Sequence, residues 1–389
     1  MLNRRQALTA AALAMAGRSS WFARRACAQD VPFVDRTATI GDDSTWESSS
    51  QAAIAVERGL GWLAANQGSA GNWGSSDLGL VGLGALAFLA AGHAPGRSKY
   101  GTTVARALDF ILSSAKPSGL LNISSPNNDM YNHGLAVFVL TQAFGVHDDR
   151  RMSPALDKGL KLISNVQSDD GGWNYIAAKH PRGHDLSLTV MQAKALRAGM
   201  DMGMDIPSTV VDRAIAYIRG KYSTAGPPDG KRYGSDPLAA RPGAFTYTGG
   251  EVTRGAEPIA MAACGAVCLQ EFGQYDDFRI FRSLDLAAER YRKFVELKKN
   301  SLPGDAYMMY YLAQGLYQVG NPWWKREYPF VRDTILRTQA EDGSWEGGHR
   351  HGRPGKLFGT AVGAFVLSIP NRYLPILQRG ERMGRGLGG

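Results

Sequence analysis

The sequence has little cysteine, with three residues in a chain of 389, and this excludes a small disulfide-stapled scaffold. Cys27 lies in the N-terminal segment discussed below. Cys264 and Cys268 are four residues apart inside the apolar run 260–269, which predicts two buried thiols on one face of a helix. The core must therefore hold the fold together without covalent cross-links.

Long hydrophobic runs and an excess of one charge are also missing. Beyond the first thirty residues the longest apolar stretch is 78–91, which is too short and too rich in glycine to span a bilayer. The net charge of +9 comes largely from five arginines in residues 1–28, a stretch without acidic residues. Without that stretch, 39 basic residues face 35 acidic ones, a balance of +4. We expect a soluble mature protein that binds no nucleic acid.

The N-terminal segment has the features of an export signal. Arg4 and Arg5 precede an apolar run, 7–16, and a small-x-small motif at 26–28 ends before Gln29. The paired arginines predict a twin-arginine signal over residues 1–28, with a general secretory signal as the alternative. We therefore expect a periplasmic or secreted protein with an N-terminal extension over 29–51 and a disordered Gly/Arg tail over 379–389.

Three segments share the pattern Q-x-x-x-G-x-W. Before each one lies an amphipathic stretch with helical spacing, and after each one lies a stretch that is apolar nearly all round. The amphipathic helix must face water, whereas the apolar helix is buried on most sides. The three patterns are Gln67, Gly71, Trp73; Gln167, Gly171, Trp173; and Gln339, Gly343, Trp345.

The same alternation continues between these segments, with weaker turns. Three further pairs are predicted: 104–114 with 133–144, 211–221 with 258–272, and 287–298 with 306–319. Helix pairs in series form either an open solenoid or a closed ring. Because the second helix of each pair is too apolar to line an exposed surface, the sequence favours an all-α toroid, (α/α)6, over residues 52–378. A tetratricopeptide-type solenoid is the alternative.

The Q-x-x-x-G-x-W pattern after an amphipathic helix resembles the QW repeat of squalene-hopene and oxidosqualene cyclases. The helix pairs resemble the toroid shared with the β subunits of protein prenyltransferases, and the likeness runs from about Ala52 to Leu374. In that family the QW turn is structural: the glutamine caps helix ends and the tryptophan stacks between units. The resemblance implies an isoprenoid-like or other hydrophobic ligand in a central cavity.

Two motifs that carry chemistry in this superfamily are incomplete or missing. Where squalene-hopene cyclases have D-x-D-D-T, this sequence matches at Asp185 and Thr189 but lacks both central acids. The Asp-x-Cys pair that helps to bind zinc in protein prenyltransferases does not occur. Triterpene cyclisation and protein prenylation are therefore both doubtful.

In a closed ring, polar residues at the starts of the inner helices gather at one mouth. Aspartates at such positions are also ordinary helix caps, so their clustering with histidines carries the functional argument. The catalytic candidates are Asp185, His133, His184 and His351, and the substrate-binding candidates are Asp77, Tyr131, Glu257, Asp305, Tyr307 and His349. No pair has close metal-ligand spacing, so the sequence identifies no cofactor, and a metal held by His133, His184, Asp185 and His349 or His351 stays open.

The sequence is compatible with three functions. The first is an enzyme or binding protein for a hydrophobic ligand, the second a carbohydrate-active toroid, lyase or hydrolase, and the third a scaffold without catalysis. The loop over 222–255 is long enough for a lid, and 347–355 is rich in His, Arg and Gly and suits an anion.

Overall fold

A computed structural model describes residues 49–96, 98–147, 149–223, 243–247, 257–297, 306–347 and 355–378. Within these ranges the chain forms twelve α-helices and one pair of two-residue strands. The predicted signal segment, the start of the N-terminal extension and the C-terminal tail lie outside the described residues.

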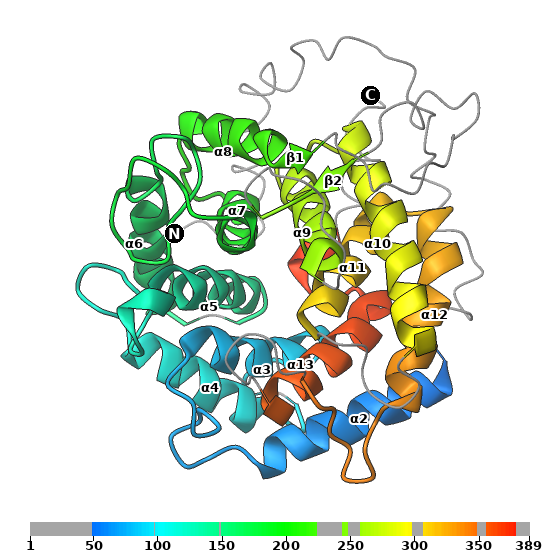
Figure 1. The fold of residues 1–389 in the computed structure, drawn as a ribbon. Coiled ribbons are helices and arrows are strands. Elements are labelled where there is room, and N and C mark those ends of the chain that lie inside the picture. Colours follow the sequence, from blue (N-terminus) through cyan, green and yellow to red (C-terminus); the bar gives the residue numbers. More distant parts are fainter. Residues whose placement is uncertain are drawn as a thin grey trace, which may run out of the picture. The chain divides into compact units, whose positions relative to one another are not determined.

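The helices alternate between an outer and an inner ring (Figure 1). The predicted all-α toroid of six helix pairs is confirmed. The outer helices are α2 (Ser50–Ala65), α4 (Gly101–Ser113), α6 (Met152–Asn165), α8 (Ser208–Gly220), α10 (Phe278–Leu297) and α12 (Trp323–Arg337). The inner helices are α3 (Leu78–Ala90), α5 (Asp129–Phe144), α7 (Leu186–Asp201), α9 (Glu257–Glu271), α11 (Ala306–Val319) and α13 (Gly355–Ser368).

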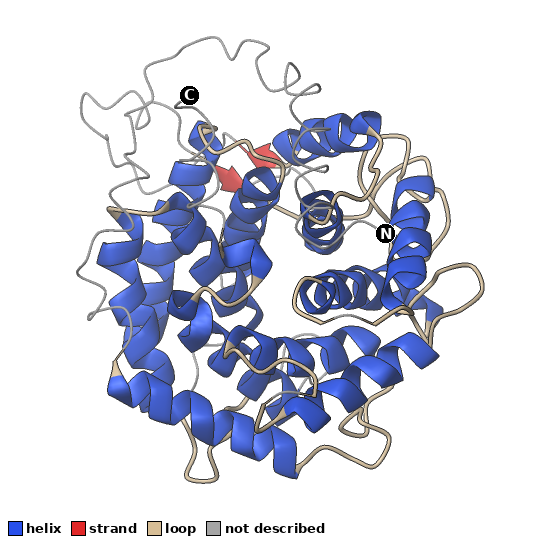
Figure 2. Cartoon of the chain, turned by 180° about the vertical axis from the view of Figure 1, so that it is seen from behind, coloured by secondary structure: helices blue, strands red, loops and turns tan. Residues whose placement is uncertain are grey.

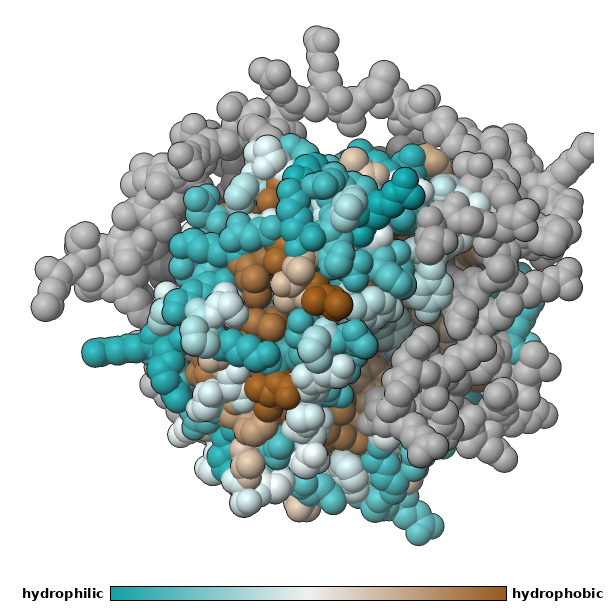
Figure 3. All heavy atoms as spheres, turned by 60° about the vertical axis from the view of Figure 1, so that its left-hand side comes forward, coloured by the Kyte–Doolittle hydropathy of each residue, from teal (hydrophilic) through white to brown (hydrophobic). Residues whose placement is uncertain are grey.

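Apolar patterning explains which helix lies in which ring. In α6 the buried residues recur at helical spacing, at Met152, Leu156, Gly159, Leu160 and Ile163, and the rest of the helix faces outward. In α3 nearly every residue is buried, because neighbours surround the helix on all sides. Seen from one side, the surface is mainly hydrophilic, with small hydrophobic groups between (Figure 3).

Short elements complete the described chain. Of three 3-10 helices, η4 (Pro126–Asn128) leads into α5, η5 (Ile369–Asn371) follows α13, and η6 (Pro375–Leu377) lies three residues after η5. Strands β1 (Tyr222–Ser223) and β2 (Ala244–Phe245) pair antiparallel and are the two arrows among the helices of Figure 2. The sequence did not predict these strands, which are too short to show alternation.

Each Q-x-x-x-G-x-W turn follows the outer helix of a pair, and its glutamine side chain forms a hydrogen bond with the next outer helix. The Gln167 side-chain amide donates to the Gly171 carbonyl of its own turn and to the Val210 carbonyl of α8, both at 2.9 Å. The indole of Trp173 donates to the Ile163 carbonyl at the end of α6, also at 2.9 Å. The turn therefore ties down carbonyls at the end of one outer helix and the start of the next.

The third such turn closes the ring. The Gln339 amide donates to the Ala55 carbonyl of the first outer helix at 2.8 Å, and the Arg58 guanidinium reaches back to the carbonyls of Ala340 and Glu341 at 3.0 and 2.8 Å. The last helix pair thus lies against the first, as the red and blue ends of the ribbon show in Figure 1. This contact distinguishes the fold from an open solenoid.

Candidate functional site

All six inner helices begin at the same end of the ring, because each follows an outer helix that runs in the opposite direction. We call this end the mouth. Hydrogen bonds join neighbouring helix starts there: the Met130 amide donates to the Tyr175 carbonyl, and the Leu186 amide donates to the Tyr247 carbonyl. Loops from well-separated parts of the sequence therefore meet at the mouth.

Asp185 is the centre of a hydrogen-bonded group at the mouth. Its Oδ1 accepts from the Ser187 amide at 2.9 Å, the Leu188 amide at 3.2 Å and the Ser187 hydroxyl at 2.6 Å. Its Oδ2 accepts from the Tyr175 hydroxyl at 3.1 Å and lies 2.9 Å from His184 Nδ1. Asp185 is thus the N-cap of α7 and also positions three side chains.

Tyr131 adds a residue of α5 to this group. Its hydroxyl lies 2.5 Å from Ser187 Oγ. Its ring stacks on Tyr175 at 5.7 Å between centroids, and Tyr175 meets the His184 ring edge-on at 4.6 Å. We call Tyr131, Tyr175, His184, Asp185 and Ser187 the mouth cluster.

The mouth cluster spans a gradient from protein interior to solvent. Burial, with a smaller contribution from Asp185, raises the pKa of Tyr131 well above its usual value. The pKa of Tyr175 rises to about 12, mainly through burial and then through the nearby charge of Asp185. At the other end, the His184 side chain is 53% exposed. The cluster therefore links a desolvated phenol to a solvent-exposed imidazole.

Tyr307 reaches the same region from α11. Its hydroxyl lies 3.6 Å from the sulfur of Cys264 on α9, and burial raises the Tyr307 pKa well above its usual value. Cys264 also acts electrostatically on Tyr131, so side chains of α5, α9 and α11 converge. The structure thus brings together four predicted residues, Tyr131, His184, Asp185 and Tyr307.

Deeper in the ring, side chains of α7 contact α9 and α11. The Tyr311 hydroxyl of α11 lies 2.9 Å from the Met191 sulfur of α7. Lys194 of α7 donates to Glu271 of α9 at 3.0 Å and to Gln314 of α11 at 2.6 Å. These contacts, which we call the floor, bridge α7 and α11 past α9 at positions further along the inner helices than the mouth cluster.

His133 does not join the mouth cluster. Its ring is fully buried between α5 and α6, where Nδ1 accepts from the Leu121 amide at 3.1 Å and Nε2 lies 3.0 Å from the Gly159 carbonyl. Burial lowers its pKa to about 4. Both nitrogens are engaged with the backbone of neighbouring segments, which is a structural arrangement.

Asp77 belongs to a separate polar network. Its Oδ1 accepts from the Asn132 amide at 3.3 Å, and Asn132 also donates to Asn122 at 2.9 Å. Asn122 in turn donates to Asp129 at 2.7 Å. Sequence reasoning missed Tyr175, Ser187, Asn122 and Asp129, which carry no motif and lie mostly in loops or first helical turns.

The structure does not test the other predicted site residues. The Glu257 side chain, Asp305, His349 and His351 lie outside the described residues, as do most of the predicted lid and of the basic loop. Across the described ranges, no group of three or more His, Cys, Asp or Glu side chains is arranged to hold a metal ion. Nor does any helix in those ranges combine the length and apolarity needed to cross a bilayer.

Comparison with known proteins places the fold but no family. No family model and no curated protein matches the chain. A crystal structure of a protein from Actinoplanes is similar, with a TM-score of 0.54 and 17% identity over 82% of this chain and 98% of the other. A variant of the type II terpene cyclase MstE from Scytonema, in complex with its substrate geranylgeranyl dihydroxybenzoate, has a TM-score of 0.51 and 14% identity over 83% and 98%. This chain thus shares its toroid with a terpene cyclase.

Proposed function

We propose that this protein binds an isoprenoid-like hydrophobic small molecule at the mouth of the ring. The supporting observation concerns Tyr131 and Tyr307. Burial raises the pKa of both hydroxyls, yet both residues keep some solvent-accessible surface. Side chains that are desolvated yet accessible are expected to line a recess enclosed by protein. The isoprenoid substrate of MstE supports this ligand class.

The walls of the proposed recess suit such a ligand. The rings of Tyr131, Tyr175 and Tyr307 offer aromatic faces, which pack well against alkene carbons and stabilise positive charge. The floor contact between Tyr311 and Met191 limits the depth of the recess. A ligand would therefore enter at the mouth and lie across the helix starts.

The mouth cluster is oriented to remove a proton from such a ligand. Because the Ser187 hydroxyl donates to Asp185, the Tyr131 hydroxyl must donate to Ser187. When a ligand C–H bond breaks, Tyr131 would accept that proton while passing its own to Ser187, which passes its own to Asp185. The electron pair of the C–H bond stays with the ligand, and Asp185 ends protonated.

This orientation differs from a role for Asp185 as a strong acid. The Asp185 carboxylate accepts four hydrogen bonds, two of them from backbone amides, and is therefore oriented as an acceptor. The His184 ring lies 2.9 Å from Oδ2 of that carboxylate, helps to hold it in place and is exposed to solvent on its other side. We thus assign Tyr131, Ser187 and Asp185 to the proton path, His184 to holding the Asp185 carboxylate, and Tyr131 and Tyr307 to ligand contact.

A carbohydrate-active role has less support. Asp129 and Asp185, buried carboxylates of the mouth, accept hydrogen bonds at both of their oxygens. For Asp129 the donors are the Asn122 side chain and the Ala177 amide, so this carboxylate holds loops together. Glycoside hydrolysis needs two carboxylates that face the substrate.

Export through the twin-arginine route remains part of the proposal, with Arg4 and Arg5 as the recognised pair. We expect Arg4→Lys/Arg5→Lys to retain the precursor in the cytoplasm, and the mature N-terminus to lie near Gln29. Fractionation and N-terminal sequencing measure both. Normal export of the double-lysine variant would point to the general secretory route instead.

Ligand binding is tested by mass spectrometry of organic extracts from the purified protein. We expect a terpenoid or polyprenyl mass in the wild type, its loss in Tyr131→Ala and Tyr307→Ala, and its retention in Ser187→Ala, which interrupts only the proton path. Ser164→Ala on outer helix α6 is the matched control, since its hydroxyl also bonds within the protein. Extracts without lipid, together with no saturable binding of added geranylgeraniol, would contradict the proposal.

A further inference from the structure

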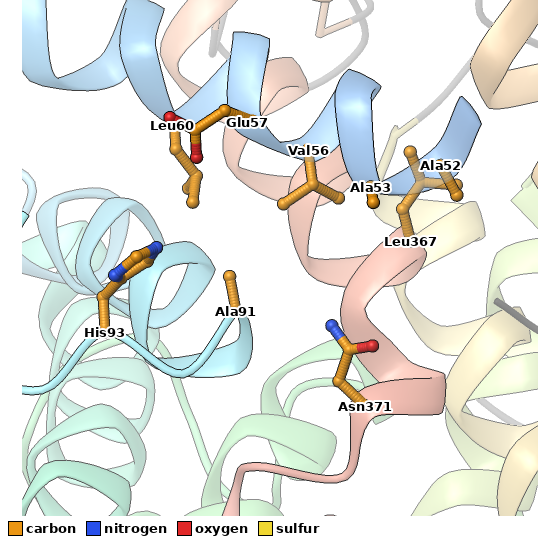
Figure 4. A pocket seen from close by; sticks show the side chains of 9 residues that line it. All are labelled: Ala52, Ala53, Val56, Glu57, Leu60, Ala91, His93, Leu367 and Asn371. Carbon is orange, nitrogen blue, oxygen red and sulfur yellow. The ribbon is translucent and has the colours of Figure 1, made fainter. Parts of the chain in front are cut away.

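A cavity lies at the end of the ring opposite the mouth. It has a volume of about 170 Å³ and opens between the first half of α2 and the ends of α3 and α13 (Figure 4). Its lining residues are Ala52, Ala53, Val56, Glu57, Leu60, Ala91, His93, Leu367 and Asn371. Most of this lining is aliphatic, and three side chains are polar.

The three polar side chains converge on the cavity. Figure 4 shows the Glu57 carboxylate, the His93 ring and the Asn371 amide facing the space between the helices. Oε1 of Glu57 accepts from Lys99 Nζ and, at 2.8 Å, from the Tyr100 hydroxyl. Among the described residues, no hydrogen bond engages Glu57 Oε2, the His93 ring nitrogens or the Asn371 amide. These groups are available to a ligand.

The backbone fixes His93 in this position. Helix α3 ends in a Schellman motif: the Gly92 amide donates to the Leu89 carbonyl at 3.0 Å and the His93 amide to the Phe88 carbonyl at 2.9 Å. Gly92 adopts φ +90°, which only glycine tolerates easily. The His93 ring then packs edge-on against Tyr100 at 5.0 Å. This side of the cavity is therefore preformed.

The cavity lining contains one carboxylate, that of Glu57, and no lysine or arginine. Burial acts to raise the pKa of Glu57, but the hydrogen bonds from Lys99 and Tyr100 outweigh it, so the carboxylate stays ionised. Burial lowers the pKa of His93, which keeps the ring neutral at pH 7. The carbonyl ends of α3 and α13 also point toward this end of the ring and carry partial negative charge. Lys99 forms an ion pair with Oε1 of Glu57, but it is 66% exposed and does not line the cavity, so Oε2 remains for a second cation.

We propose that this cavity binds a short primary alkylammonium ion. The ammonium group donates to Glu57 Oε2, to the Asn371 side-chain oxygen and to His93, while the alkyl chain packs against Val56 and Leu60. At about 30 Å³ per water-sized group, the volume fits about six non-hydrogen atoms. This site is separate from the mouth and does not depend on the proposed function.

The test is a titration of the full chain with n-butylammonium, followed by NMR shifts of backbone amides. We expect saturable shifts at the start of α2 and after α3 and α13, with a millimolar dissociation constant. Butan-1-ol and butyrate are the matched neutral and anionic probes, and both should bind at least tenfold more weakly. Equal binding of butan-1-ol, or no saturable shift with butylammonium, would overturn the proposal.

Two variants locate the charge and the amide. Glu57→Gln should raise the dissociation constant for butylammonium about tenfold, and Asn371→Ala about threefold. Glu289→Gln is the matched control, since Glu289 also pairs with a lysine, Lys293, on an outer helix. Unchanged affinity in both cavity variants, each confirmed as folded by its amide spectrum, would show that the ammonium does not bind in this cavity.

Discussion

The buried imidazole of His133 makes stability depend on pH. Its folded pKa is about 4, below the value of about 6.5 in an unfolded chain. The unfolded state therefore binds the proton first, and stability falls as pH drops from about 6.5 to about 4. At 1.36 kcal/mol per pKa unit, the loss reaches about 3 kcal/mol.

His133→Asn removes this titration and separates it from that of other groups. The variant should be about 2 kcal/mol less stable than wild type at pH 7, because two buried hydrogen bonds change. At pH 4.5 that difference should shrink or vanish, since only the wild type loses stability through this group. Urea denaturation at both pH values measures it, and an equal difference at both would contradict the assignment.

The glycine of each Q-x-x-x-G-x-W turn is required for two separate reasons. Gly171 has φ +94°, and a Cβ there would lie 2.2 Å from the Arg213 carbonyl oxygen. Gly203 has φ +77° but open space around it. We expect Gly203→Ala to cost about 1 kcal/mol through backbone strain alone, and Gly171→Ala about 3 kcal/mol or more through strain and overpacking. Denaturant unfolding of both variants compares them, and equal losses would show that the close approach relaxes freely.

The outcome for single residues shows what a sequence can and cannot reveal. Asp185 was recognisable because an acidic residue before an apolar helix is both a cap and a candidate group. His133 and Tyr131 were not separable, because α5 is buried nearly all round and no polar face marks its rotation. Two residues apart on a helix means about 200°, so Tyr131 faces the mouth cluster while His133 faces α6.

Among the helices, the floor of the ring contains a charge pair in an apolar interior. Lys194 and Glu271 have side chains only 1% and 0% exposed, and Lys194 also lies 4.6 Å from the Phe138 ring centroid. Removing one partner leaves an uncompensated buried charge. We expect Lys194→Met to lower the free energy of unfolding by about 3–5 kcal/mol.

The double variant Lys194→Met/Glu271→Leu tests this reason. If the cost comes from the stranded carboxylate, the double variant should recover stability to within about 1–2 kcal/mol of wild type, since apolar side chains of similar volume replace both charges. Chemical denaturation completes the double-mutant cycle. Additive losses would show instead that the two positions contribute through packing alone.

At the scale of elements, the sequence predicted features formed by neighbouring residues and missed features formed by segments far apart in the chain. Helix pairs and Q-x-x-x-G-x-W turns were readable because their pattern repeats within about fifty residues of chain. The cavity beside Glu57 was not, because it needs α2 near the start and Asn371 near the end of the chain, with His93 oriented by a turn. Such a cavity forms only when the ring closes, so no single segment of the sequence predicts it.

At the scale of the whole ring, closure depends on one contact, between the turn that follows α12 and helix α2, which we call the seam. Between neighbouring pairs the chain itself holds successive outer helices close, as the short connection from α3 to α4 does. Between the last pair and α2 no such connection exists, and hydrogen bonds and packing alone hold the seam. Removing equivalent hydrogen bonds at the seam and between two neighbouring pairs should therefore open different parts of the ring.

Two matched double variants measure this difference. Arg58→Ala/Gln339→Ala removes the seam bonds, and Arg106→Ala/Gln67→Ala removes their counterparts, in which Arg106 donates to Gly68 at 2.5 Å and Gln67 to Thr103 at 2.9 Å. Each variant should lose about 2 kcal/mol of stability.

The two variants should differ in where the protein opens. At the seam, α2 and α13 should lose hydrogen-exchange protection together, because either end can then separate without unfolding the rest. For the internal variant, faster exchange should stay near the turn after α2, since the covalent connection keeps α4 in place. Identical, local exchange patterns in both variants would mean that apolar packing of α13 against α2 and α3 closes the ring by itself, with the polar seam only setting its register.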